Sequence, residues 1–310
     1  MAETVATKPM SVGDLIGRAI RYYRVNITSF IHVLMWPTII SIGGKISMQW
    51  GLTILARKQY DIWPAAVASI FVGLLISFAA SFILTLRSLA FVRLANGFAT
   101  NFKDAYKHVR DKMGTVLGLI VVGHLMIAGV MGLCFAEIIA AALMFKPGSS
   151  LVYVMAVAML LGIGAVILSA MLYWLIGFVV LSAAACEDTT LGSLVSRGFA
   201  LTFNDFWRAQ LFAVIIFVTV SCLSYTLSIP AVALSTFEMI RHGVSTTVGD
   251  PSKMPMYVLV VTQAWESLVN MLLWPITWLS FGQFYYDLRV RQEGLDLLQN
   301  LKLLGQPAAP

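Results

Sequence analysis

Four charged residues lie near the ends of apolar stretches of the sequence, and they are the first candidates for chemistry. They are Lys45, Glu137, Glu238 and Glu266. Charged side chains at membrane depth are costly and often mark ion or substrate sites. These four could form a polar vestibule near the outer face that binds a cation or a lipid headgroup. The alternative is four independent interfacial residues whose charges reach water along flexible stems.

A second group of polar residues follows the last apolar stretch: Tyr286, Asp287, Arg289, Arg291 and Glu293. On a helix, Asp287 lies four residues from Arg291, and Arg289 lies four residues from Glu293, so each pair predicts a salt bridge. The arginines would also meet anionic lipid headgroups where the helix leaves the bilayer, and Gly294 would end that helix. We interpret the string as a membrane-exit anchor. The alternative is a docking site for a cytoplasmic protein partner.

The sequence lacks the common catalytic motifs, with no H-E-x-x-H, G-x-S-x-G, Walker A or G-x-G-x-x-G pattern. His32 and His124 are isolated, and each is expected to hydrogen-bond to a neighbouring helix. Cys134, Cys186 and Cys222 are far apart and are expected to be structural thiols. We therefore expect no enzyme activity, no cofactor and no metal site. Basic residues are dispersed rather than clustered, so no nucleic-acid binding is expected.

The composition identifies the class of protein that must position these residues. The AVILMFWYC set makes up 59% of the 310 residues, and charged residues make up 12%, against about 25% in soluble domains. These values exclude a soluble enzyme, a disordered chain and a disulfide scaffold, and they predict an all-α, polytopic membrane helix bundle. Long uncharged intervals predict six spans, with the fourth, in 147–186, either one bent helix or more. Their centres lie near Leu34, Leu75, Gly129, Ile167, Thr219 and Leu273.

The basic residues predict the orientation of the chain. With six spans, 15 of the 21 Lys and Arg residues fall on the side of the two termini. Cytoplasmic loops of membrane proteins carry the excess of Lys and Arg. We therefore expect a multi-pass protein of the inner membrane with both termini in the cytoplasm, in contact with anionic headgroups on that side. No signal peptide is evident.

Three segments before spans one, three and five resemble one another at offsets of about 90 residues. Ser11, Asn101 and Thr190 each precede a short amphipathic pattern as a helix cap. Short basic amphipathic helices beside a membrane commonly lie in the interface plane. We therefore predict one integral domain of three units, each an interfacial helix followed by a transmembrane hairpin, at about 11–97, 101–188 and 190–294, with a cytoplasmic tail at 295–310.

Three stretches resemble a bacterial integral membrane family labelled "glycerophosphoryl diester phosphodiesterase membrane domain". They are RYYRVNITSFI from Arg21 to Ile31, TLGSLVSRGFALTFNDFWR from Thr190 to Arg208, and YYDLRVRQEGLDL from Tyr285 to Leu297. The C-terminal string is the most specific of the three. The catalytic barrel of fused family members has no counterpart here, so the resemblance implies the membrane part alone and no phosphodiesterase activity.

Two functional hypotheses remain open at this level. The first is a non-catalytic scaffold or interaction module, acting with a protein partner or as a homo-oligomer. The second is a transporter or a lipid- or headgroup-binding protein that uses the outer vestibule. They differ in whether polar side chains converge on a pocket.

Overall fold

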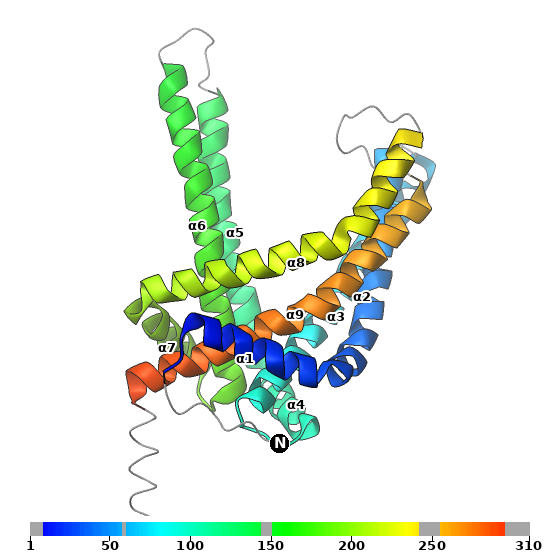
Figure 1. Cartoon of the computed structure of the whole chain (residues 1–310). Coiled ribbons are helices and arrows are strands. Elements are labelled where there is room, and N and C mark those ends of the chain that lie inside the picture. Colours follow the sequence, from blue (N-terminus) through cyan, green and yellow to red (C-terminus); the bar gives the residue numbers. More distant parts are fainter. Residues whose placement is uncertain (1–8, 58–59, 144–150, 242–254, 295–310) are drawn as a thin grey trace, which may run out of the picture.

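The computed structural model describes residues 9–57, 60–143, 151–241 and 255–294, and every long element in these ranges is an α-helix (Figure 1). The short helices are α1 (Val12–Val25), α4 (Phe102–Asp111) and α7 (Leu191–Asn204). The long helices are α2 (Ile27–Ala56), α3 (Trp63–Ala95), α5 (Met113–Leu143), α6 (Leu151–Cys186), α8 (Phe206–Arg241) and α9 (Met256–Glu293). A 3₁₀ turn, η1 (Tyr60–Ile62), precedes α3. The all-α class predicted from composition is confirmed.

The described helices follow one order three times, a short helix and then two long ones. Two predicted caps form: Ser11 Oγ accepts from Asp14 N at 3.2 Å, and Asn101 Oδ1 accepts from Asp104 N at 2.9 Å. Thr190 also stands at a helix N-cap, but its hydroxyl contacts Ser193 Oγ at 3.1 Å instead of a backbone N–H. Such caps satisfy N–H groups that a helix start leaves unpaired.

Four described helices are long and apolar enough to cross a membrane: α2, α3, α8 and α9. A fifth span is possible if α4 and the first part of α5, which meet at 63°, count as one broken span. The chain is therefore a membrane protein with four or five candidate spans in its described part, and the count of six stays a prediction. Each predicted span centre lies within one of the six long helices, and α6 is one continuous helix.

Helix α9 is the centre of the fold. From Pro275 to Leu288 every residue of α9 is buried, which is typical of a helix surrounded by others. Helix α9 contributes to two buried apolar clusters, one shared with α1, α2 and α3 and the other with α1 and α3 to α8. In Figure 1 the α5–α6 hairpin diverges from the distant ends of α2, α8 and α9. In the described part of the chain, the hairpin packs against α3, α4, α7, α8 and α9.

Helices α2 and α3 approach each other closely at small residues. A Cβ atom on Gly44 would lie 2.6 Å from Ser77 Oγ and 2.9 Å from the backbone oxygen of Gly73. A Cβ on Gly73 would lie 2.5 Å from the backbone oxygen of Gly44. Glycine is therefore needed on both helices, since small residues let membrane helices pack backbone to backbone.

Candidate functional site

We call the end of the fold that carries the short helices and the last turns of α9 the short-helix end. It contains a network of ion pairs around two buried carboxylates. Its first centre is Asp287, whose carboxylate is almost fully buried. Asp287 Oδ2 lies 2.8 Å from Arg208 Nη2 and 3.0 Å from Arg291 Nε. Asp287 Oδ1 accepts from the Met10 backbone N–H at 2.7 Å. Both arginines also donate to the Met10 carbonyl, so one cluster joins the start of the fold to α8 and α9.

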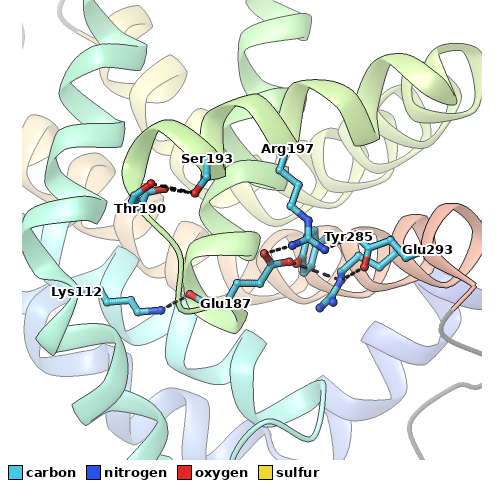
Figure 2. Close-up of polar contacts among 8 residues, drawn as sticks. Lys112, Glu187, Thr190, Ser193, Arg197, Tyr285 and Glu293 are labelled. Carbon is cyan, nitrogen blue, oxygen red and sulfur yellow. Dashed lines mark hydrogen bonds and ion pairs between the residues drawn. The ribbon is translucent and has the colours of Figure 1, made fainter. Parts of the chain in front are cut away.

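The second centre is Glu187, in the link between α6 and α7 (Figure 2). Arg197 of α7 donates to Glu187 Oε2 at 2.7 Å and also pairs with Glu293. Tyr285 donates its phenol hydrogen to Glu187 Oε1. Arg289 lies 3.6 Å from Glu187 Oε1 and 2.9 Å from Glu293 Oε2. This cluster ties the α6–α7 link to the end of α9.

The two carboxyl groups of the α6–α7 link, those of Glu187 and Asp188, have pKa values shifted in opposite directions. Burial raises the pKa of Glu187 above its ordinary value and outweighs the opposing effect of Arg197. The hydrogen bond from Lys112 lowers the pKa of Asp188, and the two charged atoms lie 2.7 Å apart. Burial lowers the pKa of His108, which stands 3.6 Å from Asp188.

Local sequence features hold the α6–α7 link in place. Ser193 donates to the Thr190 carbonyl at 2.8 Å in the first turn of α7 (Figure 2). Gly198 lets α7 lie against α6, because a Cβ there would fall 2.2 Å from Val180 Cγ2. Gly294 ends α9 with a left-handed φ of 62°, as the sequence predicted, since glycine adopts that conformation without a steric cost.

Both salt bridges predicted within the C-terminal string are present, Asp287–Arg291 and Arg289–Glu293. Tyr286 is buried, and its ring packs edge-on against Phe98. The sequence did not indicate that Glu187, Arg197 and Arg208 complete these pairs from elsewhere in the chain. The one available signal was that both arginines fall in the Thr190–Arg208 stretch that carries the family resemblance.

The four vestibule candidates are only partly brought together. Lys45 Nζ donates to Ser267 Oγ at 3.2 Å, so it contacts the neighbour of Glu266, whose own side chain is exposed. Glu238 is buried on α8 and lies 3.6 Å from Arg241 of the same helix. The side chain of Glu137 lies outside the described residues. Lys45 and Glu238 thus contact different residues, Ser267 and Arg241.

A pocket of about 630 Å³ lies between the α5–α6 hairpin and helices α3, α7 and α9. Its lining is mainly aromatic and aliphatic: Phe78, Phe82, Phe178, Phe199, Phe203, Trp174, Trp274 and Trp278 contribute from four helices. The rim residues Phe78, Trp174 and Phe203 are about half exposed, at 49%, 49% and 50%. The pocket therefore opens on the side of the helix bundle.

The pocket lining includes polar side chains, namely Ser81, Thr85, His124 and Tyr173, and the last two form a pair. His124 of α5 hydrogen-bonds through Nδ1 to Tyr173 of α6 at 3.1 Å and to the Ile120 carbonyl at 2.7 Å. The expected partner of His124 on a neighbouring helix is thus confirmed. His32, by contrast, is exposed on α2. The sequence did not predict the pocket, because its lining residues come from five helices and read individually as ordinary apolar positions.

Within the described residues, no group of three or more His, Cys, Asp or Glu side chains is arranged to hold a metal ion. Cys186 and Cys222 are free thiols, one buried and one exposed, while the side chain of Cys134 lies outside the described residues. Comparison of the chain with protein-family models, curated proteins and solved structures found no match.

Proposed function

We propose that this chain is a non-catalytic membrane protein that binds a membrane lipid in the lateral pocket. The observation that carries the proposal is the pocket itself, whose volume of about 630 Å³ falls within the range of about 300–1,000 Å³ typical of ligand sites. Lipid binding was the second hypothesis from the sequence. The proposed site, however, is the lateral pocket and not the outer vestibule.

The position of the pocket favours a lipid over a water-soluble ligand. Its rim is formed by half-exposed aromatic residues, and the neighbouring surface of α3 is apolar, with Leu74 and Leu75 each 52% exposed. In a bilayer, exposed apolar helix faces contact acyl chains. A lipid chain can thus enter sideways without crossing a polar surface.

The proposal is tested by cross-linking in nanodiscs with a phosphatidylcholine that carries a diazirine on one acyl chain. Gly177 lines the pocket and has open space where a side chain would begin. Gly177→Leu therefore fills the pocket without a backbone clash. We expect wild-type cross-links on pocket peptides of α3, α6 and α9, and their loss in Gly177→Leu.

Gly164→Leu is the matched control, because Gly164 is exposed on the same helix and also has open space around it. It should cross-link at the pocket like the wild type. Equal pocket labelling in Gly177→Leu and Gly164→Leu would refute lipid binding in the pocket, since labelling would then reflect bulk lipid on the outer helix faces.

A second candidate function is a scaffold that works at the membrane surface. The observation in its favour is α4, which exposes Lys103, Lys107 and Arg110, while Ala105 and Val109 are buried against the fold. Basic residues near a bilayer contribute about 1 kcal/mol each in contact with anionic headgroups. A protein partner with an acidic surface would use the same face.

The orientation and the location in the inner membrane, with both termini in the cytoplasm, are part of this proposal. They are supported by the uneven distribution of Lys and Arg. Labelling of Lys146→Cys and Lys302→Cys with a membrane-impermeant maleimide in intact cells and in inverted vesicles tests it. We expect opposite sides, whereas labelling from one side would overturn the six-span topology. The resemblance to the phosphodiesterase membrane family remains a prediction.

A further inference from the structure

Arg87 stands at the end of the uncharged interval of α3. The 25 residues from 62 to 86 contain no Asp, Glu, Lys or Arg, and a helix of that length spans about 38 Å. The hydrocarbon core of a bilayer is about 30 Å thick. Helix α3 therefore meets the lipid headgroups at Arg87.

The guanidinium of Arg87 is held by a carbonyl of the neighbouring helix. Its Nη1 donates to the backbone oxygen of Val33 on α2. Pro37 lies four residues after Val33 inside α2 and has no N–H, so the Val33 carbonyl lacks its usual helix partner. Arg87 supplies the missing hydrogen bond, which fixes its guanidinium beside α2.

The other edge of this guanidinium is available to a ligand. Within the described residues, Nε and Nη2 of Arg87 make no hydrogen bond, and neither is among the buried atoms that lack one, so both reach the surface. The buried carboxylates of the short-helix end bind other cations, Asp287 binding Arg208 and Glu187 binding Arg197. An arginine charge on a membrane helix is costly without a counter-ion.

The surface of α2 beside Val33 is apolar. Trp36 and Ile40 follow Val33 by three and seven residues and so lie on its side of α2, and both are exposed. They lie further from the start of α2 than Val33, towards the interior of the membrane. A phospholipid whose phosphate contacts Arg87 would therefore place its acyl chains along exposed apolar side chains.

We infer that Arg87, held by Val33, binds the phosphate of a membrane phospholipid. Nε and Nη2 of a guanidinium present parallel N–H groups, and such a pair matches two oxygens of one phosphate. The site is separate from the lateral pocket, because Thr85 of α3 lines the pocket whereas Arg87 points towards α2. The inference thus goes beyond the proposed function, and either can hold without the other.

The test measures how lipids raise the melting temperature of the protein in dodecylmaltoside, in a buffer without phosphate. The two ligands are dioleoyl phosphatidylglycerol and dioleoylglycerol, which has the same acyl chains and no phosphate. All variants carry Gly177→Leu, which fills the lateral pocket. We expect phosphatidylglycerol to reach half of its effect at about tenfold lower concentration, because hydrogen bonds to charged groups are stronger than neutral ones.

Variants connect this preference to Arg87. Arg87→Gln removes the charge but keeps an N–H donor for the Val33 carbonyl, and it should raise the phosphatidylglycerol concentration needed by about tenfold. Arg87→Lys keeps the charge without the two parallel donors and should give an intermediate value. Arg110→Gln is the matched control, because Arg110 is exposed on α4; it removes the same charge and should have a much smaller effect.

Inorganic phosphate distinguishes a lipid phosphate from a free ion. Millimolar phosphate should leave the effect of phosphatidylglycerol unchanged, because a free ion gains nothing from Trp36 and Ile40, and its displacement of the lipid would overturn the assignment to a phospholipid.

Two further results would overturn the site itself. One is an equal affinity for phosphatidylglycerol in the Arg87→Gln variant and its Arg87 parent. The other is an equal loss in Arg110→Gln, which would show only a general attraction between charges. Circular dichroism checks that each variant is folded. Should Arg87→Gln not fold, Arg87→Lys decides, and an affinity equal to that of the parent would overturn the paired contact.

Discussion

Asp287→Asn tests whether the short-helix end depends on a buried charge. The change keeps the shape of the side chain and one carbonyl oxygen, so the bond from the Met10 N–H, 2.7 Å in the wild type, can persist. It removes the negative charge that Arg208 and Arg291 approach to 2.8 and 3.0 Å. The two arginines are then left close together without their shared counter-ion.

The expected loss follows from the burial of the three groups. Removing one partner of a buried ion pair costs about 3–5 kcal/mol. The Asp287 side chain is 1% exposed, but Arg208 and Arg291 are 20% and 34% exposed, so water offsets part of the cost for the arginines. We therefore expect the free energy of unfolding to fall by about 3 kcal/mol, at the lower end of that range.

The assay is unfolding by SDS in dodecylmaltoside micelles, followed by circular dichroism and tryptophan fluorescence. Asp111→Asn is the matched control, because Asp111 is an exposed carboxylate on α4 and should change stability by less than about 0.5 kcal/mol. A loss below about 1 kcal/mol in Asp287→Asn, the level of a surface salt bridge, would refute the reasoning and show that the cluster is solvated.

Three further predictions address other parts of the fold. Met10→Pro removes the backbone N–H that donates to Asp287, so it should lower the free energy of unfolding by about 1–3 kcal/mol. Met10→Ala keeps the backbone N–H and carbonyl and should lower it less. Equal losses in the two variants would contradict a role of the N–H. Gly44→Ala places a methyl group 2.6 Å from Ser77 Oγ and should cost about 1–3 kcal/mol in the same assay, whereas Gly43→Ala, which meets open space, should be near neutral. Burial raises the pKa of Glu187, so the folded state binds the carboxyl proton of Glu187 more tightly than the unfolded state does. The melting temperature of the wild type should therefore fall as the pH rises from the ordinary glutamate pKa of about 4.3 through the raised pKa of the folded state. Glu187→Gln should flatten that slope, and an unchanged slope would count against the assignment.

The sequence predicted the features that depend on local order along the chain. Helix caps at Ser11 and Asn101 and the salt bridge from Asp287 to Arg291 each involve residues three or four apart, so helix periodicity is enough to pair them. The bond between Met10 and Asp287 joins residues 277 positions apart. Such a pairing depends on how the helices pack, which a single sequence does not specify.

The pocket is a second feature that depends on helix packing and that the sequence therefore did not predict. Trp278 reads in the sequence as one more apolar residue of the last span, and only packing shows that its N–H is buried without an acceptor. The sequence directed attention to Lys45, Glu238 and Glu266 because charge is costly in a membrane. In the fold, the carboxylates of the short-helix end pair with arginines, while the pocket is uncharged. The pocket therefore depends on how apolar residues of five helices pack together, which the charge pattern of a single sequence does not indicate.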